Sequence, residues 1–595
     1  MKRYLSHCSI SPGKVYAGDS VEFKISIIAG KDFSAEGTRI VLDHPAYLGT
    51  DRPSRYDQED GGYADVFCSN AEIAYNCRQW DMEVADFPTR EKSSYKGMAQ
   101  RLLVLDFISG KAQDGDEILI KWGWTRNGFG IGCKAPTVVP KPDFINTVHI
   151  RYFSDGTKGL PDFARSFKGY DRPIPDVEVP VSFQVLPREP ESMRLIRGQS
   201  EDALLVQDRF FNICPDAEVP KPWKKNSWRV AVMPSGKGKV EAARLPLRES
   251  PPMNNVFEGM NVYFGDLHNH SAFSNDCIER EKQEMTPDDS FGYARNVARL
   301  DFQAVTDHHQ PWDKEKNKIG EEKWNLLLQA VEKHCEPGRF LAFPGFEYRC
   351  SRGDAAVVFA GAEPYSDIDR PELCDIRRLW DAFNGKNYIT IPHFHNGGRL
   401  PENEWPRCPY EGIETILEIC SCHGSYDVEN SLEHRPPGIK NRRADRNGMW
   451  MLRNGLKYGL CCNSDGHKGN AGMNGLTAVY ARELTKEAIF EAIRKRQVYG
   501  TTNARIRLLF TADGKLMGST LKSGGRSKLG IELAGEMPFK SVELHRNGEL
   551  YRRWKPFDRE FSMKTDAVNG QPSFWHVRAV QTDNEIAWSS PIWFD

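Results

Sequence analysis

The stretch 262–271, VYFGDLHNHS, places an apolar run directly before two histidines. Val262–Leu267 is short and apolar without clear alternation, which is typical of a strand buried on both faces. His268 and His270 follow it, and alternate residues of an extended chain point the same way, so both imidazoles can face one point. The same order, an apolar run followed by residue types that bind metals, recurs in 302–309, FQAVTDHH.

Strand-like runs of this kind alternate with helical patterns through the middle of the chain. The runs lie at 262–267, 302–306, 340–346, 355–360, 388–392, 415–419, 460–463 and 476–481. The helical patterns lie at 288–299, 321–335, 376–383, 442–457 and 486–496. Thr286-Pro287 is a start signal for the first helix, because a capping hydroxyl precedes proline at the first helical position. This alternation predicts a parallel sheet, and its seven or eight strands favour a β/α barrel.

The flanking segments differ from this region, so the predicted fold class is α/β plus all-β. Residues 1–190 carry short alternating runs separated by Gly, Pro, Asp and Asn, which predicts an N-terminal β-sandwich. We expect a second β segment and linker at 191–255, the barrel at 256–500 and a small C-terminal β domain at 501–595. In the last of these, Asn547-Gly548 is a type I′ hairpin signal.

Composition narrows the classes of partner. The chain has 595 residues, with 80 Lys and Arg against 82 Asp and Glu, so no global positive field favours nucleic acid. It contains no run of about 18 apolar residues, and its start lacks the apolar stretch of a secretion signal, so we expect no membrane span and a cytoplasmic location. The 14 cysteines are spaced irregularly, which favours reduced thiols over a disulfide framework.

Ligand-type residues gather at the ends of the predicted strands. Ten of the 15 histidines lie between His268 and His467. A lone histidine at a strand end is more often a hydrogen-bonded loop residue, but six successive strand ends carry such residues. Buried carboxylates and imidazoles in one barrel mouth are costly unless a cation binds them. Mixed imidazole and carboxylate ligands suit Zn, Mn or Fe, so we expect two or three divalent transition metals.

The motifs, taken in order, resemble those of the polymerase and histidinol phosphatase (PHP) superfamily. They are HNHS at 268–271, TDHH at 306–309, GFE at 345–347, PH at 392–393, HG at 423–424 and SDGH at 464–467. The phrases YFGDLHNHS, MTPDD, VTDHH and WSSPIW also resemble a large, mostly uncharacterised PHP-like group with flanking β domains. The resemblance implies a distorted (β/α)7 barrel and a trinuclear metal centre.

The same resemblance implies an assignment of ligands to three ions. The first ion would be held by His268, His270, Glu347 and Asp465. Glu347 would bridge to a second ion held by His393 and His423. The third would be held by Asp276, His308 and His467. Members often have histidine where this chain has Asp276, and a carboxylate there should weaken a preference for softer metals.

The expected reaction is hydrolysis of a phosphoester in a small, anionic, phosphorylated metabolite by a metal-activated water, with Glu347 and Asp465 at its centre. His309 and His395 are candidate proton donors or orienting residues, and Asp307 is a candidate to orient a ligand imidazole. Candidates to bind the substrate anion are Arg352, Arg399, Lys468 and Arg505. Two alternatives remain open: a metal-dependent hydrolase or lyase acting on a non-phosphate substrate such as a sugar acid or lactone, and a metal-dependent glycan- or protein-binding module without catalysis.

Overall fold

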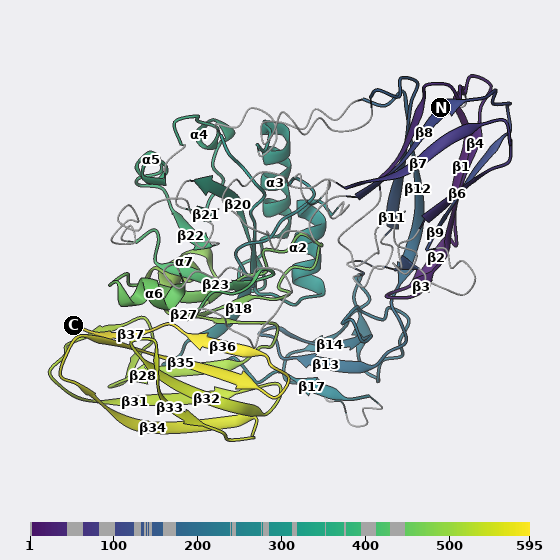
Figure 1. Ribbon diagram of the computed structural model, residues 1–595. Coiled ribbons are helices and arrows are strands. Elements are labelled where there is room, and N and C mark those ends of the chain that lie inside the picture. The colour runs from purple at the N-terminus through teal and green to yellow at the C-terminus, as the bar shows by residue number, and fades with distance from the viewer. Residues whose placement is uncertain are drawn as a thin grey trace. The chain divides into compact units, whose positions relative to one another are not determined.

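The chain forms two compact units in the computed structural model (Figure 1). The structure describes residues 3–43, 64–81, 101–123, 133–135, 139, 141, 145–158, 174–238, 240, 245–274, 277, 285–311, 318–350, 353–373, 376–393, 412–428 and 447–595. One unit comprises Met1–Pro190, Gln207–Cys214 and Asp276–Lys282, and the other comprises Glu191–Val206, Pro215–Asn275 and Gln283–Asp595.

The first unit contains two β-sheets that share one hydrophobic core. One sheet has the order β1 (Leu5–Ser11), β4 (Phe23–Ala29), β9 (Glu117–Trp122), β6 (Ala64–Cys68). The other has the order β2 (Lys14–Tyr16), β12 (Val177–Leu186), β11 (Ile145–Phe153), β5 (Arg39–Asp43), β8 (Arg101–Ser109), β7 (Ala74–Asp81). Short strands β3 (Ser20–Val21) and β10 (Cys133–Lys134) pair separately. Burial alternates along β12, so every second side chain enters the core.

The second unit begins with a small sheet. Its order is β15 (Lys224–Lys225), β16 (Ala231–Pro234), β14 (Glu201–Gln207), β13 (Ser192–Ile196), β17 (Leu247–Glu249). The main sheet of this unit has 13 described strands. It runs through β22 (Tyr388–His393), β21 (Gly353–Phe359), β20 (Leu341–Cys350), β19 (Phe302–Val305), β18 (Asn261–Asp266), β26 (Leu476–Ala481) and β27 (Val498–Thr501).

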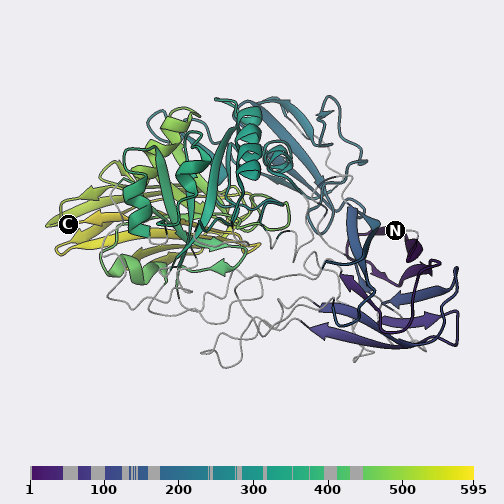
Figure 2. The same cartoon turned by 90° about the horizontal axis from the view of Figure 1, so that it is seen from above.

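That sheet continues into the C-terminal part of the chain. After β27 come β36 (Ile586–Ser589), β35 (Ser573–Gln581), β32 (Phe539–Arg546) and β33 (Glu549–Trp554), while β37 (Ile592–Phe594) pairs with β35 and with β30 (Thr520–Leu521). Figure 2 shows the yellow C-terminal strands beside the teal and green strands of this unit. One core cluster contains both Phe264 and Trp575. A separate sheet has the order β29 (Lys515–Leu516), β28 (Arg507–Ala512), β31 (Gly525–Ala534), β34 (Glu560–Asn569).

The expected α/β class with a closed (β/α)7 barrel is wrong. Strands take up 46% of the described residues and helices 11%. The expected barrel strands belong to two sheets, because β23 (Ile416–Ser421) pairs with β24 (Gly424–Ser425) and β25 (Gly459–Cys462) and not with the main sheet. Among the described strands of the main sheet, β18, β19 and β20 run parallel, whereas β21, β22, β26 and β27 pair antiparallel.

The described helices are short and lie beside these strands. They are α2 (Pro287–Asn296), α3 (Glu321–His334), α4 (Tyr365–Ile368), α5 (Ile376–Ala382), α6 (Gly448–Arg453) and α7 (Lys486–Arg494). Helix α2 packs on α3 and β19, and α3 packs on β20. Thr286 caps α2 as expected: its hydroxyl accepts from Asp289 N at 3.3 Å, with Pro287 at the first helical position. No described helix is long and apolar enough to span a membrane.

The predicted hairpin in the C-terminal part is confirmed. Arg546 pairs with Glu549 across a two-residue turn made by Asn547 and Gly548, whose φ angles are 52° and 76°. Positive φ at both central residues is what a type I′ turn requires, and Asn-Gly adopts it at low cost.

Candidate metal centre

Strand ends bring the predicted ligands together. His268 and His270 follow β18, His308 follows β19, Glu347 lies in β20 and His393 ends β22. Two short bridges continue the pairing beyond the regular strands, Asn269 with Gly466 and His308 with Glu347, both parallel. The backbone NH of Asp465 donates to the His268 carbonyl at 2.8 Å. Segments up to 199 positions apart, from His268 to His467, therefore meet without a closed barrel.

Glu347 is buried with imidazoles on both carboxylate oxygens. Its Oε2 lies 2.8 Å from His308 Nδ1 and 3.3 Å from His270 Nε2, and its Oε1 lies 2.9 Å from His393 Nε2. These histidines come from three different strand ends. The two oxygens of Glu347 thus face different imidazoles, while its expected role as a bridge between two ions stays a prediction.

Asp465 forms a second such centre. Its Oδ1 lies 3.2 Å from His270 Nε2 and 3.4 Å from His268 Nε2, and its Oδ2 lies 3.0 Å from His423 Nε2. Its φ is 47°, an uncommon conformation for a residue with a side chain. Strain of this kind persists where the surroundings determine the conformation and is frequent at functional sites.

The side chains behind the ligands fix which ring nitrogen faces the centre. His268 Nδ1 donates to Glu418 Oε2 at 3.2 Å. His270 Nδ1 donates to Ser274 Oγ at 2.8 Å, because that hydroxyl itself donates to Asp307 Oδ1 at 2.7 Å. In both histidines Nε2 is therefore the ring nitrogen that faces the centre, and outer partners of metal-binding histidines usually fix the ring in this way. Asp307 orients an imidazole as expected, through Ser274.

Three buried polar atoms in the centre lack the partners that such atoms need, and this bears on whether a cation fits there. Nε2 of His268, Nε2 of His270 and Oε2 of Glu347 have no hydrogen-bond partner. Buried polar atoms are nearly always hydrogen-bonded, and lone pairs that face one another repel unless a proton or a cation lies between them. The donor set and its arrangement therefore fit a divalent cation.

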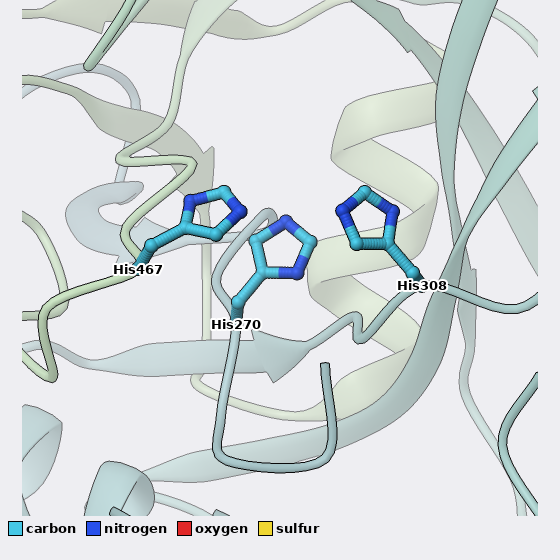
Figure 3. A group of neighbouring side chains, drawn as sticks. All are labelled: His270, His308 and His467. Carbon is cyan, nitrogen blue, oxygen red and sulfur yellow. The ribbon is translucent and has the colours of Figure 1, made fainter. Parts of the chain in front are cut away.

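Among the described residues, four groups of three ligand atoms lie within 4.8 Å of one another. The groups are His268, Glu347 and His393; His268, His270 and Asp465; His270, His308 and His467; and Cys422, Asp465 and His467. Figure 3 shows the third group, with the imidazole of His270 between those of His467 and His308. The centroid of the His270 ring lies 4.1 Å from that of the His467 ring and 4.7 Å from that of the His308 ring.

The groups differ in part from the expected ligand sets. His423 contacts Asp465, whereas the resemblance assigned it with His393 to the ion beside Glu347. His270 joins His308 and His467, so the third group contains three imidazoles. Asp276, which was expected there, lies outside the described residues. His270 and His467 each belong to two of the four groups, so each links neighbouring groups.

The pKa shifts reflect close charge pairing. Burial lowers the pKa of His268, but Asp465 and Glu418 outweigh burial and raise it well above its usual value. The pKa of His423 is also raised, against burial, by Cys422 and Asp465. Burial raises the pKa values of Glu347 and Asp465, but the facing imidazoles hold both well below their usual range. Protons on these imidazoles therefore balance the carboxylates and compete with a cation for the same lone pairs.

Sequence reasoning missed Glu418 and Asp266. Glu418 lies in the otherwise apolar run of β23, with Oε2 on His268 and Oε1 4.0 Å from His393 Nδ1. Asp266 accepts from Ser464 N at 3.0 Å and Gly472 N at 2.9 Å, which ties β18 to the segment carrying Asp465, and burial raises its pKa to about 6. The available signal was an acidic residue within a buried apolar strand, since such a residue needs a partner.

Two expected site residues have other roles in the structure. His309 was expected as a proton donor or orienting residue, but its Nδ1 accepts from Ile319 N and its Nε2 donates to Ile368 O, each at 3.1 Å. Burial lowers the pKa of His309 to about 4, so it is a neutral packing residue. Arg505 was expected to bind substrate, but it is buried over the Phe264 ring and donates to the carbonyls of Ala298 and Arg299. Lys468 follows His467 and is half-buried. Arg352, His395 and Arg399 lie outside the described residues.

A family model matches the part of the chain that contains Asp465 and His467. It is described as "Protein of unknown function (DUF3604)" and matches residues 462–538. An uncharacterized protein of Chlamydia pneumoniae is 26% identical over 373 residues, which cover 56% of this chain and 57% of that protein. One of Chlamydia trachomatis serovar D is 24% identical over 369 residues, covering 56% of this chain and 58% of that protein. The chain thus spans little more than half the length of these curated relatives.

Comparison with solved structures adds no argument. An FMN-binding beta-glucuronidase from Facaelibacterium prausnitzii has a TM-score of 0.14 and 10% identity, over 98% of this chain and 92% of that chain. An Escherichia coli alpha-2-macroglobulin has a TM-score of 0.12 and 9% identity, over 100% of this chain and 44% of that chain. TM-scores this low establish neither fold nor function.

Proposed function

We propose that this protein is a metal-dependent hydrolase with two or three divalent transition-metal ions (Zn, Mn or Fe), acting on a phosphoester in a small phosphorylated metabolite. The order of the ligand motifs supports a relationship to the PHP superfamily, without its closed barrel. One observation carries the proposal: the buried Nε2 atoms of His268 and His270 lie 3.4 Å and 3.2 Å from Asp465 Oδ1 and lack hydrogen-bond partners.

The chain's own residues would supply positioning and charge balance. Glu418 and the Asp307–Ser274 pair hold the imidazoles of His268 and His270 with Nε2 toward the centre. Glu347 and Asp465 each offer two oxygens to different histidines, so each can serve more than one ion. When bound, a divalent ion supplies a Lewis acid that lowers the pKa of water and neutralises charge on a phosphate. Lys468, next to His467, is a candidate to bind the substrate anion.

Elemental analysis of unsupplemented protein, followed by a panel of phosphomonoesters and phosphodiesters with Mn, Zn or Fe, tests the proposal. We expect bound metal and release of phosphate, both lost in Glu347→Gln. The matched control is Glu336→Gln, which alters a carboxylate whose side chain is 52% exposed and should change neither. If the metal-replete protein hydrolyses no phosphoester, the phosphate assignment fails.

Further outcomes separate the alternatives. Turnover of lactones or sugar acids by protein inactive on phosphoesters would favour a hydrolase or lyase of another bond, because the same Lewis acid activates attack on carbonyls. Binding of glycan or protein that survives Asp465→Ala, with no turnover of any substrate, would favour a binding module. A cytoplasmic location is also part of the proposal, because the 14 cysteines are spaced irregularly along the sequence.

A further inference from the structure

Cys422 occupies the turn that follows β23, directly against the segment that carries Asp465. It and His423 form the two-residue connection between Ser421 of β23 and Gly424 of β24, which pair with each other. The Cys422 backbone NH donates to the Ser464 carbonyl at 2.9 Å. Its thiol donates to the Asp465 carbonyl at 3.1 Å. Two bonds thus hold Cys422 beside Asp465.

The position of the thiol makes it a third ligand-type atom beside two expected ligands. One atom each of Cys422, Asp465 and His467 lie within 4.8 Å of one another. The same Asp465 carboxylate belongs to the group with His268 and His270, which are fully buried. Their Nε2 atoms lack hydrogen-bond partners and lie 3.4 Å and 3.2 Å from Asp465 Oδ1. The unpartnered atoms and the thiol therefore lie around one carboxylate.

We propose that Cys422 is a metal ligand and forms, with Asp465 and His467, a sulfur-containing cation position. Asp465 then bridges this position and the one beside His268 and His270. Coordination requires that the thiol proton leave to solvent. The hydrogen bond from the thiol to the Asp465 carbonyl is then lost, and a sulfur lone pair binds the metal. Soft sulfur favours Zn²⁺ or Fe²⁺ over Mn²⁺, so this ligand would set the metal preference of the centre.

This inference rests on the proposed metal centre and deepens it by naming a class of metal. It needs no particular substrate, so it is tested by spectroscopy on the full chain loaded with Co²⁺, with the metal alone as the probe. Ligand-field absorption reports cobalt bound to any ligands. Thiolate-to-cobalt charge-transfer absorption in the near ultraviolet reports a bound sulfur.

We expect both signals in the unmodified protein and in Cys335→Ser. The latter is the matched control, because Cys335 is half-buried at the end of α3 and belongs to none of the four ligand groups. Cys422→Ser should retain the ligand-field bands and lose charge transfer. It should weaken Zn²⁺ binding at this position more than about 100-fold, since loss of an outer partner alone costs about 10–100-fold. Mn²⁺ binding should change less.

Charge transfer that persists in Cys422→Ser, or ligand-field bands without charge transfer in the unmodified protein, would overturn the role of Cys422 and leave the proposed hydrolase standing. No cobalt binding in any variant would overturn the metal centre and the sulfur ligand together. Phosphoester turnover is measured separately. Its absence, with charge transfer present and dependent on Cys422, would count against the phosphoesterase and support the sulfur ligand.

Discussion

Glu347 in the candidate metal centre and Glu536 in the C-terminal β region are both buried carboxylates with lowered pKa values, yet their partners differ. Glu536 accepts from Arg194 Nη2 at 2.6 Å and Nε at 2.9 Å, and from Arg505 N at 2.8 Å. Glu347 faces imidazoles. A guanidinium stays charged and has no lone pair to offer, whereas an imidazole can lose its proton and bind a metal. The partner, more than the burial, thus separates a structural carboxylate from a candidate ligand.

Removing the charge of Glu536 should give the largest effect. Glu536→Gln leaves the Arg194 guanidinium without its buried counter-charge, and breaking such a pair costs about 3–5 kcal/mol. We expect a corresponding fall in the free energy of unfolding, measured by denaturant titration, with unchanged metal content. The control is Glu491→Gln, because Glu491 pairs with Lys495 at an exposed surface and should change stability little. If folded Glu536→Gln lost its metal, the purely structural role of Glu536 would be contradicted.

Removing the charge of Glu347 should have the opposite profile. Glu347→Gln takes away a shared ligand, so metal affinity should fall more than about 100-fold, beyond the cost of losing an outer partner. Its effect on unfolding of the metal-free protein should be smaller than that of Glu536→Gln, since neighbouring imidazoles can give up their protons. Metal titration and denaturant titration of the same sample measure both. Full metal occupancy in Glu347→Gln would show that the ligand assignment is wrong.

Glu418 sharpens the comparison because it lies behind the imidazoles. Glu418→Gln should weaken metal binding about 10–100-fold by loosening His268, whose Nδ1 it holds. The readout is the metal dissociation constant together with the affinity of Glu418→Asp, which should recover part of the loss if the negative charge matters. Equal losses in both variants would indicate that Glu418 only fills space in β23.

The pH dependence of metal binding should give the smallest effect. The pKa values of His268 and His423 are raised in the metal-free protein, so their imidazoles keep their protons to higher pH and a metal must displace these protons. Metal affinity should therefore rise with pH, by about tenfold per pH unit for each proton released, until pH exceeds those raised values. Without metal, the stabilisation from these charged histidines is present at lower pH and is lost as pH rises through the raised pKa. Metal titrations over a pH series measure the slope. A pH-independent affinity would contradict this competition.

The sequence predicted many elements because their local patterns were strong. The run 476–481 is β26, the helical pattern 321–335 becomes α3 (Glu321–His334), and the Asn547-Gly548 hairpin is present. Strand direction was not predictable in this way. A strand buried on both faces has the same apolar composition in parallel and antiparallel pairing, so β21 and β22 were expected in a parallel barrel and instead pair antiparallel.

The chemical types of the candidate ligands and their places at strand ends came from the sequence alone, because alternation along a strand and the residue types that bind metals are local properties. Only the tertiary structure decided which of them meet. It placed His423 on Asp465 and set His309 and Arg505 among backbone carbonyls and amides. It also brought Glu418 behind His268 and Cys422 beside Asp465. These outcomes depend on contacts between segments far apart in the chain, which no local pattern encodes.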